Sequence, residues 1–378
     1  MGLKKSLKGE SALFRFLVII LIFYSLFVPF ALADESSIEI SSEAAILMEF
    51  NNGQILYEKN AFKRLAPAST TKVLTALLAL DYGEAAQQVK ITAKAARVGE
   101  ASIYLQQGEI LTIEELLKGA LIKSGNDAAY ALAETVAGNA ELFANLMDRK
   151  AMSLGAFDSH FVNPNGLPHK EHLTNAHDLA VITREAVKDP LFNDIVSTKY
   201  ASIPWGNHSW KRSLKNTNRL LFSYPGADGI KTGTTRQAGS CLIASATRGD
   251  RRLIAVVLNS GNRYGDIEKL LNFGFDNFTL KRISSQSIVG KVRIEREVLP
   301  LAAAEKMMWS LPKDRKEELE YNLKLHKKLY PPLEKGETVG IFSVLLNGKE
   351  LTCVRVITAK ELKKPPLLLS RYFKFSNE

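Results

Sequence analysis

The sequence predicts an α+β protein in which helices pack on a mainly antiparallel sheet and a small all-β domain follows. Three observations predict this fold. Helical periodicity dominates from about residue 67 to residue 187, strand patterns flank it on both sides, and beyond about residue 280 only strand patterns remain. The chain has 378 residues, of which 46% are apolar and 24% are charged, which is enough for one large packed domain and a smaller one.

The N-terminal segment has the features of a secretory signal peptide. An apolar run covers about residues 16–28, and Pro29 and the small-residue sequence Ala31-Leu32-Ala33 follow it. We expect cleavage after Ala33, so that residues 1–33 are no part of the fold. An uncleaved membrane anchor is the alternative, because residues 13–33 are almost long enough to span a bilayer. The basic residues ahead of the apolar run are Lys4, Lys5, Lys8 and Arg15.

The charge balance favours an exported protein at an anionic surface. The net charge is +10, and loss of residues 1–33, with four bases and one acid, leaves +7. This suits a cell wall or the outer face of the cytoplasmic membrane. The sequence has no basic helix, no zinc-ligand spacing and no interleaved aromatic and basic residues, so we do not expect a nucleic-acid partner.

The two cysteines, Cys241 and Cys353, are too few for a disulfide scaffold. Both stand in apolar, strand-like runs, so we expect two separate buried thiols. A single bridge between them after export is the alternative.

The first predicted elements are a hairpin and a run of helices. Residues 44–50 and 54–57 are predicted to form a β-hairpin around Asn51-Asn52-Gly53, a sequence typical of a tight hairpin turn. Helical patterns then cover residues 73–80, 113–122 with Thr112 as a candidate N-cap, 128–136 and 176–187. Residues 239–246 and 252–258 are predicted to form two further strands, which pair antiparallel because only residues 247–250 join them.

The C-terminal part is predicted to be all-β. Residues 288–294 and 321–325 alternate with period two, and residues 339–345 and 351–357 form a predicted hairpin. The expected organisation is a signal peptide (1–33), a first domain (34–281), a β domain (282–362) and a tail (363–378). Leucines, aromatic residues and basic residues in the tail suit a membrane interface, and packing on the β domain is the alternative.

Ser69 and Lys72 are the first candidate catalytic pair. They are three residues apart at the start of a predicted helix, so their side chains share one face. A serine hydroxyl needs a base to become a good nucleophile, and a lysine can be that base only when burial or a second cation lowers its pKa. Alone, the pair is weak evidence, because this spacing often arises by chance on helices and is better explained as a capped helix start.

Two further elements carry chemically suitable residues. In Ser124-Gly125-Asn126, a hydroxyl and an amide follow a predicted helix, and the alternative interpretation is a polar turn with an N-cap. Lys231-Thr232-Gly233-Thr234 opens a predicted edge strand, where one cation and two hydroxyls would suit a terminal carboxylate. Gly233 leaves room for a ligand to lie against that strand.

These three elements, in this order, resemble the serine D-alanyl-D-alanine carboxypeptidases, the low-molecular-mass penicillin-binding proteins. The resemblance covers about residues 40–280, and the β domain is similar to the C-terminal module of the family. It implies a penicillin-binding, β-lactamase-like transpeptidase domain that needs no cofactor and no metal. The segments that carry it are 66–72, 123–128, 161–167 and 228–234.

The resemblance implies a role for each site residue. Ser69 would attack the carbonyl of the penultimate D-alanine of a peptidoglycan stem peptide, with Lys72 as general base. Ser124 would relay a proton to the leaving amine, and Asn126 would help to hold the acyl group. Lys231 and Thr232 would bind the terminal carboxylate, Gly233 would allow close approach, and the backbone N–H groups of Ser69 and Thr234 would form the oxyanion hole. β-Lactams would then be covalent inhibitors.

Some points stay open from sequence alone. Some relatives have histidine where this chain has Thr234, which could alter the preference for substrates or β-lactams. Arg263 could add positive charge beside the carboxylate or could be a surface residue. A β-lactamase would need a glutamate-held water, and we find no convincing Glu-x-x-x-Asn sequence between Asn126 and Lys231. A non-catalytic wall-binding protein is the third reading, against which the intact serine and both lysines argue.

Overall fold

The computed structural model describes residues 38–206, 208–294, 297–313, 319–326 and 328–363. The predicted signal peptide and the predicted tail beyond Lys363 lie outside these residues. Within the described ranges, no helix is both long enough and apolar enough to cross a membrane.

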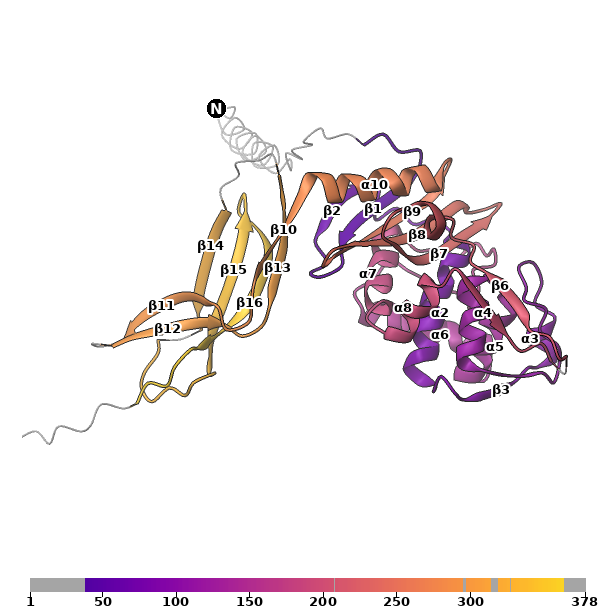
Figure 1. The fold of residues 1–378 in the computed structure, drawn as a ribbon, viewed down its shortest axis with the longest axis horizontal. Coiled ribbons are helices and arrows are strands. Elements are labelled where there is room, and N and C mark those ends of the chain that lie inside the picture. The colour runs from indigo at the N-terminus through magenta and orange to yellow at the C-terminus, as the bar shows by residue number, and fades with distance from the viewer. Residues whose placement is uncertain (1–37, 207, 295–296, 314–318, 327, 364–378) are drawn as a thin grey trace, which may run out of the picture. The chain divides into compact units, whose positions relative to one another are not determined.

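A five-stranded antiparallel sheet is the centre of the first domain (Figure 1). Its strand order is β2-β1-β9-β8-β7, so β7 is an edge strand, as the sequence predicts. The 44–57 hairpin and the antiparallel pairing of the strands around residues 239–258 are confirmed as well. The strands are β1 (Ala44–Glu49), β2 (Ile55–Lys59), β7 (Ala227–Thr235), β8 (Gly239–Arg248) and β9 (Arg251–Ser260).

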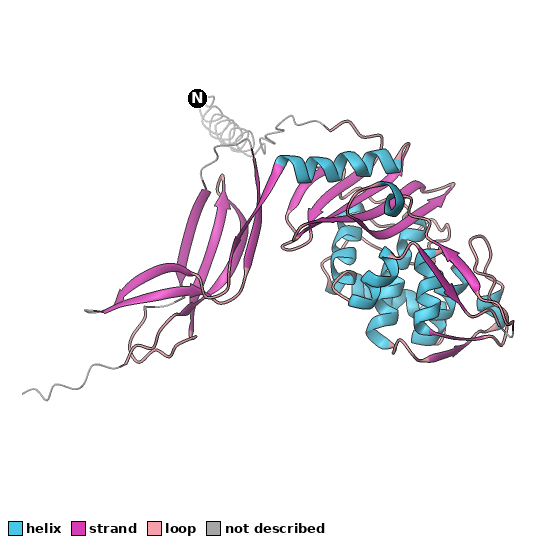
Figure 2. Ribbon diagram, viewed as in Figure 1, coloured by secondary structure: helices cyan, strands magenta, loops and turns pink. Residues whose placement is uncertain are grey.

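Helices cover both faces of this sheet (Figure 2). One long helix, α10 (Arg263–Asn277), packs on β9, β8 and β1, and α7 (Ala176–Ala186) and α8 (Pro190–Ser197) pack on the other face. Both faces of β1 are therefore covered, and all six of its residues are buried. This burial explains its continuous apolar run, which lacks strict alternation.

The other helices form a bundle around α2 (Lys72–Tyr82). Residues 72–79 of α2 are all buried, as expected for a helix with neighbours on every side. The predicted helix at residues 113–122 is confirmed as α4 (Ile113–Ile122), and Thr112 and Glu115 form a capping box at its start. The bundle also contains α5 (Asn126–Ala137) and α6 (Ala140–Ser153), with the short helices η1 (Ala68–Thr71), α3 (Ala93–Ala96) and α9 (Leu220–Ser223) nearby.

Two small antiparallel pairs complete the first domain. Strand β3 (Gln88–Lys90) pairs with β4 (Ile110–Thr112), and β5 (Tyr200–Ile203) pairs with β6 (Arg212–Lys215).

The C-terminal part is all-β, as predicted. A five-stranded antiparallel sheet has the order β11-β12-β16-β15-β14, and its buried side chains form a separate core that includes Leu299, Val344 and Val356. Strand β10 (Phe278–Ile283) pairs with β13 (Met307–Pro312) in a further two-stranded sheet. The strands of the larger sheet are β11 (Ile288–Ile294), β12 (Glu297–Ala303), β14 (Leu319–Leu325), β15 (Thr338–Leu346) and β16 (Lys349–Thr358).

The expectation of two buried thiols is wrong for Cys353. Both cysteines are free, and Cys241 is buried, but Cys353 is exposed. Along β16 the buried positions are Val354, Val356 and Thr358, so the two-residue period of the strand turns Cys353 to the opposite face.

A buried ion pair links β1 and β9 to β13. The Arg251 Nε donates to Glu49 Oε2 at 2.8 Å, and the Ser310 hydroxyl donates to the same oxygen at 2.8 Å. The Arg251 Nη1 also donates to the carbonyls of Gly274 and Phe278. Glu49 and Ser310 have no exposed surface, so these hydrogen bonds supply the polar contacts that water would otherwise make.

Candidate active site

Ser69 lies in a tight turn whose backbone is held from two sides. It belongs to the 3-10 helix η1, and α2 continues directly from Lys72. The residue before it, Ala68, has a φ of +51°, a left-handed conformation that is unfavourable for a residue with a side chain. The sequence predicts a helix start here but not this 3-10 turn.

Two glycines make the close packing around this turn possible. A Cβ on Gly166 would lie 1.9 Å from the Ala68 carbonyl oxygen, and one on Gly233 would lie 3.0 Å from the Ser69 nitrogen. Gly166 also has a φ of +82°, which favours glycine. Gly166 therefore packs against the Ala68 peptide, and the edge strand β7 passes beside the Ser69 N–H.

Lys72 is buried with its amine beside the Ser69 hydroxyl. Its Nζ lies 2.9 Å from Ser69 Oγ, 2.7 Å from Asn126 Oδ1 and 2.8 Å from the Asn165 carbonyl oxygen. Lys72 is 0% exposed, whereas Ser69 is partly exposed. The predicted pair is thus in contact, with the hydroxyl on the accessible side.

The partners of Lys72 constrain where its protons point. The Asn165 carbonyl can only accept, and Asn126 Oδ1 accepts while its Nδ2 donates to the Gly99 carbonyl at 2.9 Å. A neutral lysine amine has two N–H groups and one lone pair. With both N–H groups donated to these oxygens, the lone pair points at Ser69 Oγ and can accept the hydroxyl proton.

The pKa of Lys72 is lowered well below its usual value. Burial is the largest cause and the nearby Lys231 ammonium is the second, while Asp127 and Glu100 act in the opposite direction. Burial, with a contribution from Arg263, lowers the pKa of Lys231 to about 7. The site therefore favours a neutral Lys72, the form that the base in the predicted chemistry must have.

The Asn126 side chain is positioned by the start of α5 and the loop before it. Gly125 is the N-cap of α5, and the Asn126 N–H donates to the Ala101 carbonyl at 2.7 Å. The adjacent Asp127 carboxylate accepts from the Ser102 hydroxyl and from the backbone N–H groups of Ile103 and Leu105. This network fixes the loop against the helix start.

Ser124 is nearby in the chain but is not joined to the other candidates. Its backbone is left-handed, with a φ of +69°, and it is buried. Among the described residues, its hydroxyl makes no hydrogen bond with Ser69, Lys72 or Lys231. The expected relay therefore rests on its position two residues before Asn126.

The segment Lys231-Thr232-Gly233-Thr234 runs along the sheet edge next to η1. The Lys231 Nζ is buried and donates to the Thr232 carbonyl at 3.0 Å, and the Thr232 hydroxyl is 2.8 Å from that of Thr217. The Thr234 side chain is exposed. All four predicted residues thus lie on one strand that borders Ser69.

Arg263 is the first residue of α10, and its side chain contacts β7, so it is no isolated surface residue. Its Nη1 donates to the Gly233 carbonyl at 3.0 Å and to Thr234 Oγ1 at 2.7 Å. With Lys231, it adds a second cation beside the predicted carboxylate site.

Three contributors were missed by the sequence reasoning. The Asn165 carbonyl and Gly166 act through backbone, which no side-chain pattern reveals, although residues 161–167 carry part of the family resemblance. His172 contacts Thr71 in the same turn as Ser69, and a lone histidine gives no signal in a sequence.

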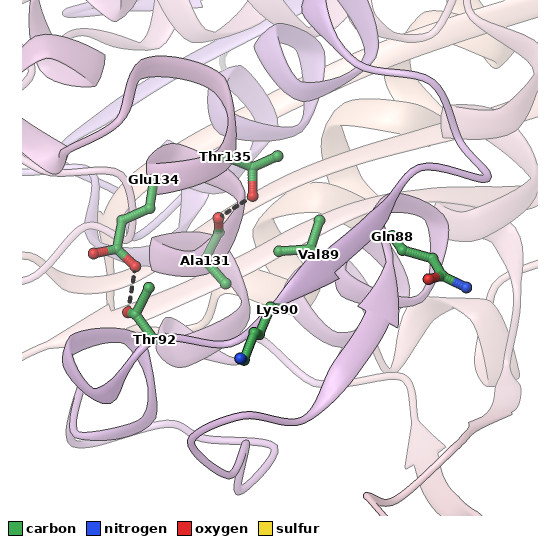
Figure 3. A pocket seen from close by; sticks show the side chains of 7 residues that line it. All are labelled: Gln88, Val89, Lys90, Thr92, Ala131, Glu134 and Thr135. Atoms are coloured by element: carbon green, nitrogen blue, oxygen red, sulfur yellow. Dashed lines mark hydrogen bonds between the residues drawn. The ribbon is translucent and has the colours of Figure 1, made fainter.

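A separate cavity lies away from the site residues around Ser69 (Figure 3). It has a volume of about 240 Å³ between β3 and the C-terminal half of α5, and shares no lining residue with the Ser69 constellation. Within it the Thr92 hydroxyl already donates to Glu134 Oε2 at 2.6 Å. Its lining residues are Gln88, Val89, Lys90, Thr92, Ala131, Glu134 and Thr135.

Comparison with known families agrees with both parts of the chain. The profile of the family described as D-alanyl-D-alanine carboxypeptidase matches residues 31–262. A second profile, described as the C-terminal domain of penicillin-binding protein 5, matches residues 279–364.

Curated proteins and solved structures give the same result. The chain is 34% identical over 356 residues to D-alanyl-D-alanine carboxypeptidase DacF of Bacillus subtilis, covering 89% of this chain and 91% of that protein. It is also 34% identical to DacC of Escherichia coli, covering 87% of each. Penicillin-binding protein 5 of Haemophilus influenzae matches with a TM-score of 0.75 and 28% identity, covering 87% of this chain and 99% of that one. The Streptomyces K15 DD-transpeptidase, solved as a mutant, matches with a TM-score of 0.61 and 32% identity, covering 64% and 100%.

Proposed function

The chain belongs to the D-alanyl-D-alanine carboxypeptidase family, and we propose that it removes the terminal D-alanine from peptidoglycan stem peptides through an acyl-enzyme at Ser69. The observation that carries this proposal is the contact between the partly exposed Ser69 hydroxyl and the buried Lys72 amine at 2.9 Å. A base whose lone pair faces a serine hydroxyl is the arrangement that nucleophilic acyl transfer requires.

Acylation begins when Ser69 Oγ attacks the carbonyl carbon of the penultimate D-alanine. The Ser69 proton passes to the lone pair of Lys72, which becomes an ammonium. The negative charge that develops on the carbonyl oxygen is stabilised by the backbone N–H groups of Ser69 and Thr234. Close approach of strand and turn, which the missing side chain of Gly233 permits, supports this pairing of donors.

Collapse of the tetrahedral intermediate breaks the peptide C–N bond. The terminal D-alanine leaves as an amine and takes up the proton that Ser69 gave to Lys72. Ser124 is the group that relays this proton, on the argument of its place beside Asn126 in the chain. Asn126 keeps the Lys72 amine in position and holds the acyl group.

The free carboxylate of the substrate is recognised on the edge strand β7. Lys231 and Arg263 supply positive charge, and Thr232 supplies a hydroxyl. A substrate without that carboxylate would lack the charge-assisted hydrogen bonds that these groups can offer, which explains a preference for the end of a peptide. Water then attacks the acyl carbon, the ester bond between that carbon and Ser69 Oγ breaks, and Ser69 Oγ takes up a proton from the water as the shortened peptide is released.

The substrate and the N-terminal sequence both favour action outside the cytoplasm. Export through residues 1–33, with cleavage after Ala33, is supported by the basic start, the apolar run and the small-residue site. Peripheral contact of residues 363–378 with the membrane is supported only by their leucines, aromatic residues and basic residues.

Release of D-alanine from a peptide that ends in D-Ala-D-Ala tests this function. We expect wild-type protein to release D-alanine and Ser69→Ala to release none, because Ser69 has the only hydroxyl among the described residues that is hydrogen-bonded to Lys72. Ser153→Ala is the matched control, since that serine is exposed on α6. Absence of release by folded wild-type protein would refute the function, and equal release by Ser69→Ala would refute the nucleophile.

A further inference from the structure

His172 is joined by hydrogen bonds to the turn that contains Ser69. It is 2% exposed, its Nδ1 is 2.9 Å from the Val162 backbone nitrogen, and its Nε2 is 2.9 Å from Thr71 Oγ1. Thr71 Oγ1 in turn donates to the Ala68 carbonyl oxygen at 2.8 Å. Neither His172 nor Thr71 has a part in the acyl transfer described above.

These three hydrogen bonds form a series from the Val162 N–H through His172 and Thr71 to the Ala68 carbonyl, and the direction of each is determined. A backbone N–H can only donate, so His172 Nδ1 must be the unprotonated acceptor of the Val162 N–H. The ring proton is then on Nε2 and is donated to Thr71 Oγ1. Because Thr71 Oγ1 accepts this hydrogen bond, its own hydroxyl proton is free to be donated to the Ala68 carbonyl oxygen.

The surroundings of His172 keep the ring neutral and therefore in this tautomer. Burial, together with smaller contributions from charge repulsion by His160 and His169, lowers the pKa of His172 to about 4. His160 itself is paired with Asp148 of α6 at 2.7 Å, and Phe161 packs edge-on against the His172 ring. The direction of these hydrogen bonds therefore stays the same at every pH well above the pKa of His172.

The Ala68 carbonyl belongs to the same peptide group as the Ser69 N–H, which must stabilise the oxyanion. The Ala68 C=O and the Ser69 N–H belong to one planar peptide unit, so fixing the oxygen fixes the direction of the N–H. This peptide follows a residue with φ of +51°, a conformation that relaxes unless its surroundings hold it. A hydrogen bond to the oxygen also polarises the N–H.

We propose that His172 and Thr71 are positioning residues that hold the Ala68–Ser69 peptide so that its N–H can bind the oxyanion. The proposal rests on the proposed function. Gly166 packs against the same peptide, so the unit is held by hydrogen bonding and by packing. The hydrogen bonds from His172 through Thr71 to Ala68 act on the acylation step and leave carboxylate binding on β7 unchanged.

The test is the rate of acylation by benzylpenicillin, measured separately from reversible binding. In that reaction Ser69 Oγ bonds to the β-lactam carbonyl carbon, the ring C–N bond breaks, and the nitrogen takes up the proton from Ser69. We expect Thr71→Val, which removes the hydroxyl at constant shape, to lower the acylation rate constant by about 10-fold to 100-fold with little change in binding. Thr71→Ser, which keeps the hydroxyl, should restore most of the rate.

Thr70→Val is the matched control. Thr70 is buried in the same turn, and its hydroxyl donates to the Pro67 carbonyl at 2.7 Å, one peptide unit upstream. The Thr70→Val variant should lose about as much thermal stability as Thr71→Val but should keep an acylation rate close to that of wild type. In the same way, His172→Gln keeps an N–H donor that can reach Thr71, and should be faster than His172→Leu.

The possible results distinguish a failure of the positioning role of His172 and Thr71 from a failure of the proposed acyl transfer at Ser69. Failure of wild-type protein to acylate would contradict the proposed function. If wild type acylates and Thr71→Val acylates equally fast, the hydrogen bonds through His172 and Thr71 have no role in acylation, and the proposal is overturned. Equal slowing by Thr70→Val, or no recovery in Thr71→Ser, would show that the turn is needed only for folding and would overturn the proposal.

Discussion

Lys72 is the side chain whose protonation state determines the reaction. Its amine is buried and donates to two oxygens, and the ammonium of Lys231 opposes a second positive charge nearby. Ser69 and Lys72 were predictable because three-residue spacing at a helix start brings side chains together. The Asn165 carbonyl was not, since a backbone oxygen 93 residues away from Lys72 leaves no side-chain pattern.

The two lysines predict a bell-shaped dependence of kcat/KM on pH. Activity should rise as pH increases through the lowered pKa of Lys72, because only neutral Lys72 accepts a proton. It should fall as pH passes the Lys231 pKa of about 7, because neutral Lys231 no longer attracts the substrate carboxylate. The measurement is D-alanine release across pH at low substrate concentration.

Lys231→Arg separates the two limbs of this profile. Arginine stays charged, so the alkaline limb should move to higher pH even if the maximum rate is lower. An alkaline limb that does not move would contradict the assignment of that limb to Lys231.

At the scale of elements, the site depends on a loop, a strand and a turn that meet at Ser69. Gly166 comes from the loop before α7, and Gly233 comes from β7. The sequence predicted β7 as an edge strand and α4 with its Thr112 cap, because these depend on local patterns. It did not predict the 3-10 geometry of η1, which depends on packing against Gly166 and Gly233.

Gly166→Ala should therefore impair chemistry beyond its effect on stability. The new Cβ would lie 1.9 Å from the Ala68 oxygen, so the turn must shift, and we expect acylation to slow by about 100-fold. Gly155→Ala is the matched control, since Gly155 also has a positive φ, +88°, but has no atom within 4 Å of the new Cβ. Both should lose about 1–2 kcal/mol from strain.

Only Gly166→Ala should show the slower acylation. Equal acylation rates in the two variants, measured with benzylpenicillin, would refute the role of close packing at Ala68.

At the scale of the molecule, a buried ion pair connects the catalytic sheet to β13. Glu49, Arg251 and Ser310 are far apart in the sequence, and charge patterns alone gave no reason to pair them. The β-strand pattern after residue 280 predicted the all-β part correctly, but not these contacts. The face of Cys353 was also mispredicted, because an apolar run does not reveal which face of a strand is covered.

Loss of this network should reduce stability without altering chemistry. Ser310→Ala removes one hydrogen bond to Glu49 and should cost about 1–2 kcal/mol in the free energy of unfolding. Glu49→Ala leaves Arg251 buried without its partner and should cost about 3–5 kcal/mol. Chemical denaturation measures both, and a smaller loss for Glu49→Ala than for Ser310→Ala would contradict this account.

The intact mass of the protein after reaction with benzylpenicillin tests the central claim most directly. Opening of the β-lactam ring expels no leaving group, so the protein should gain the whole mass of one penicillin, on the peptide that contains Ser69. Ser69→Ala should gain nothing, and slow loss of the adduct from wild type would exclude a β-lactamase. An adduct on another residue, or D-alanine release without any adduct, would contradict Ser69 as the nucleophile.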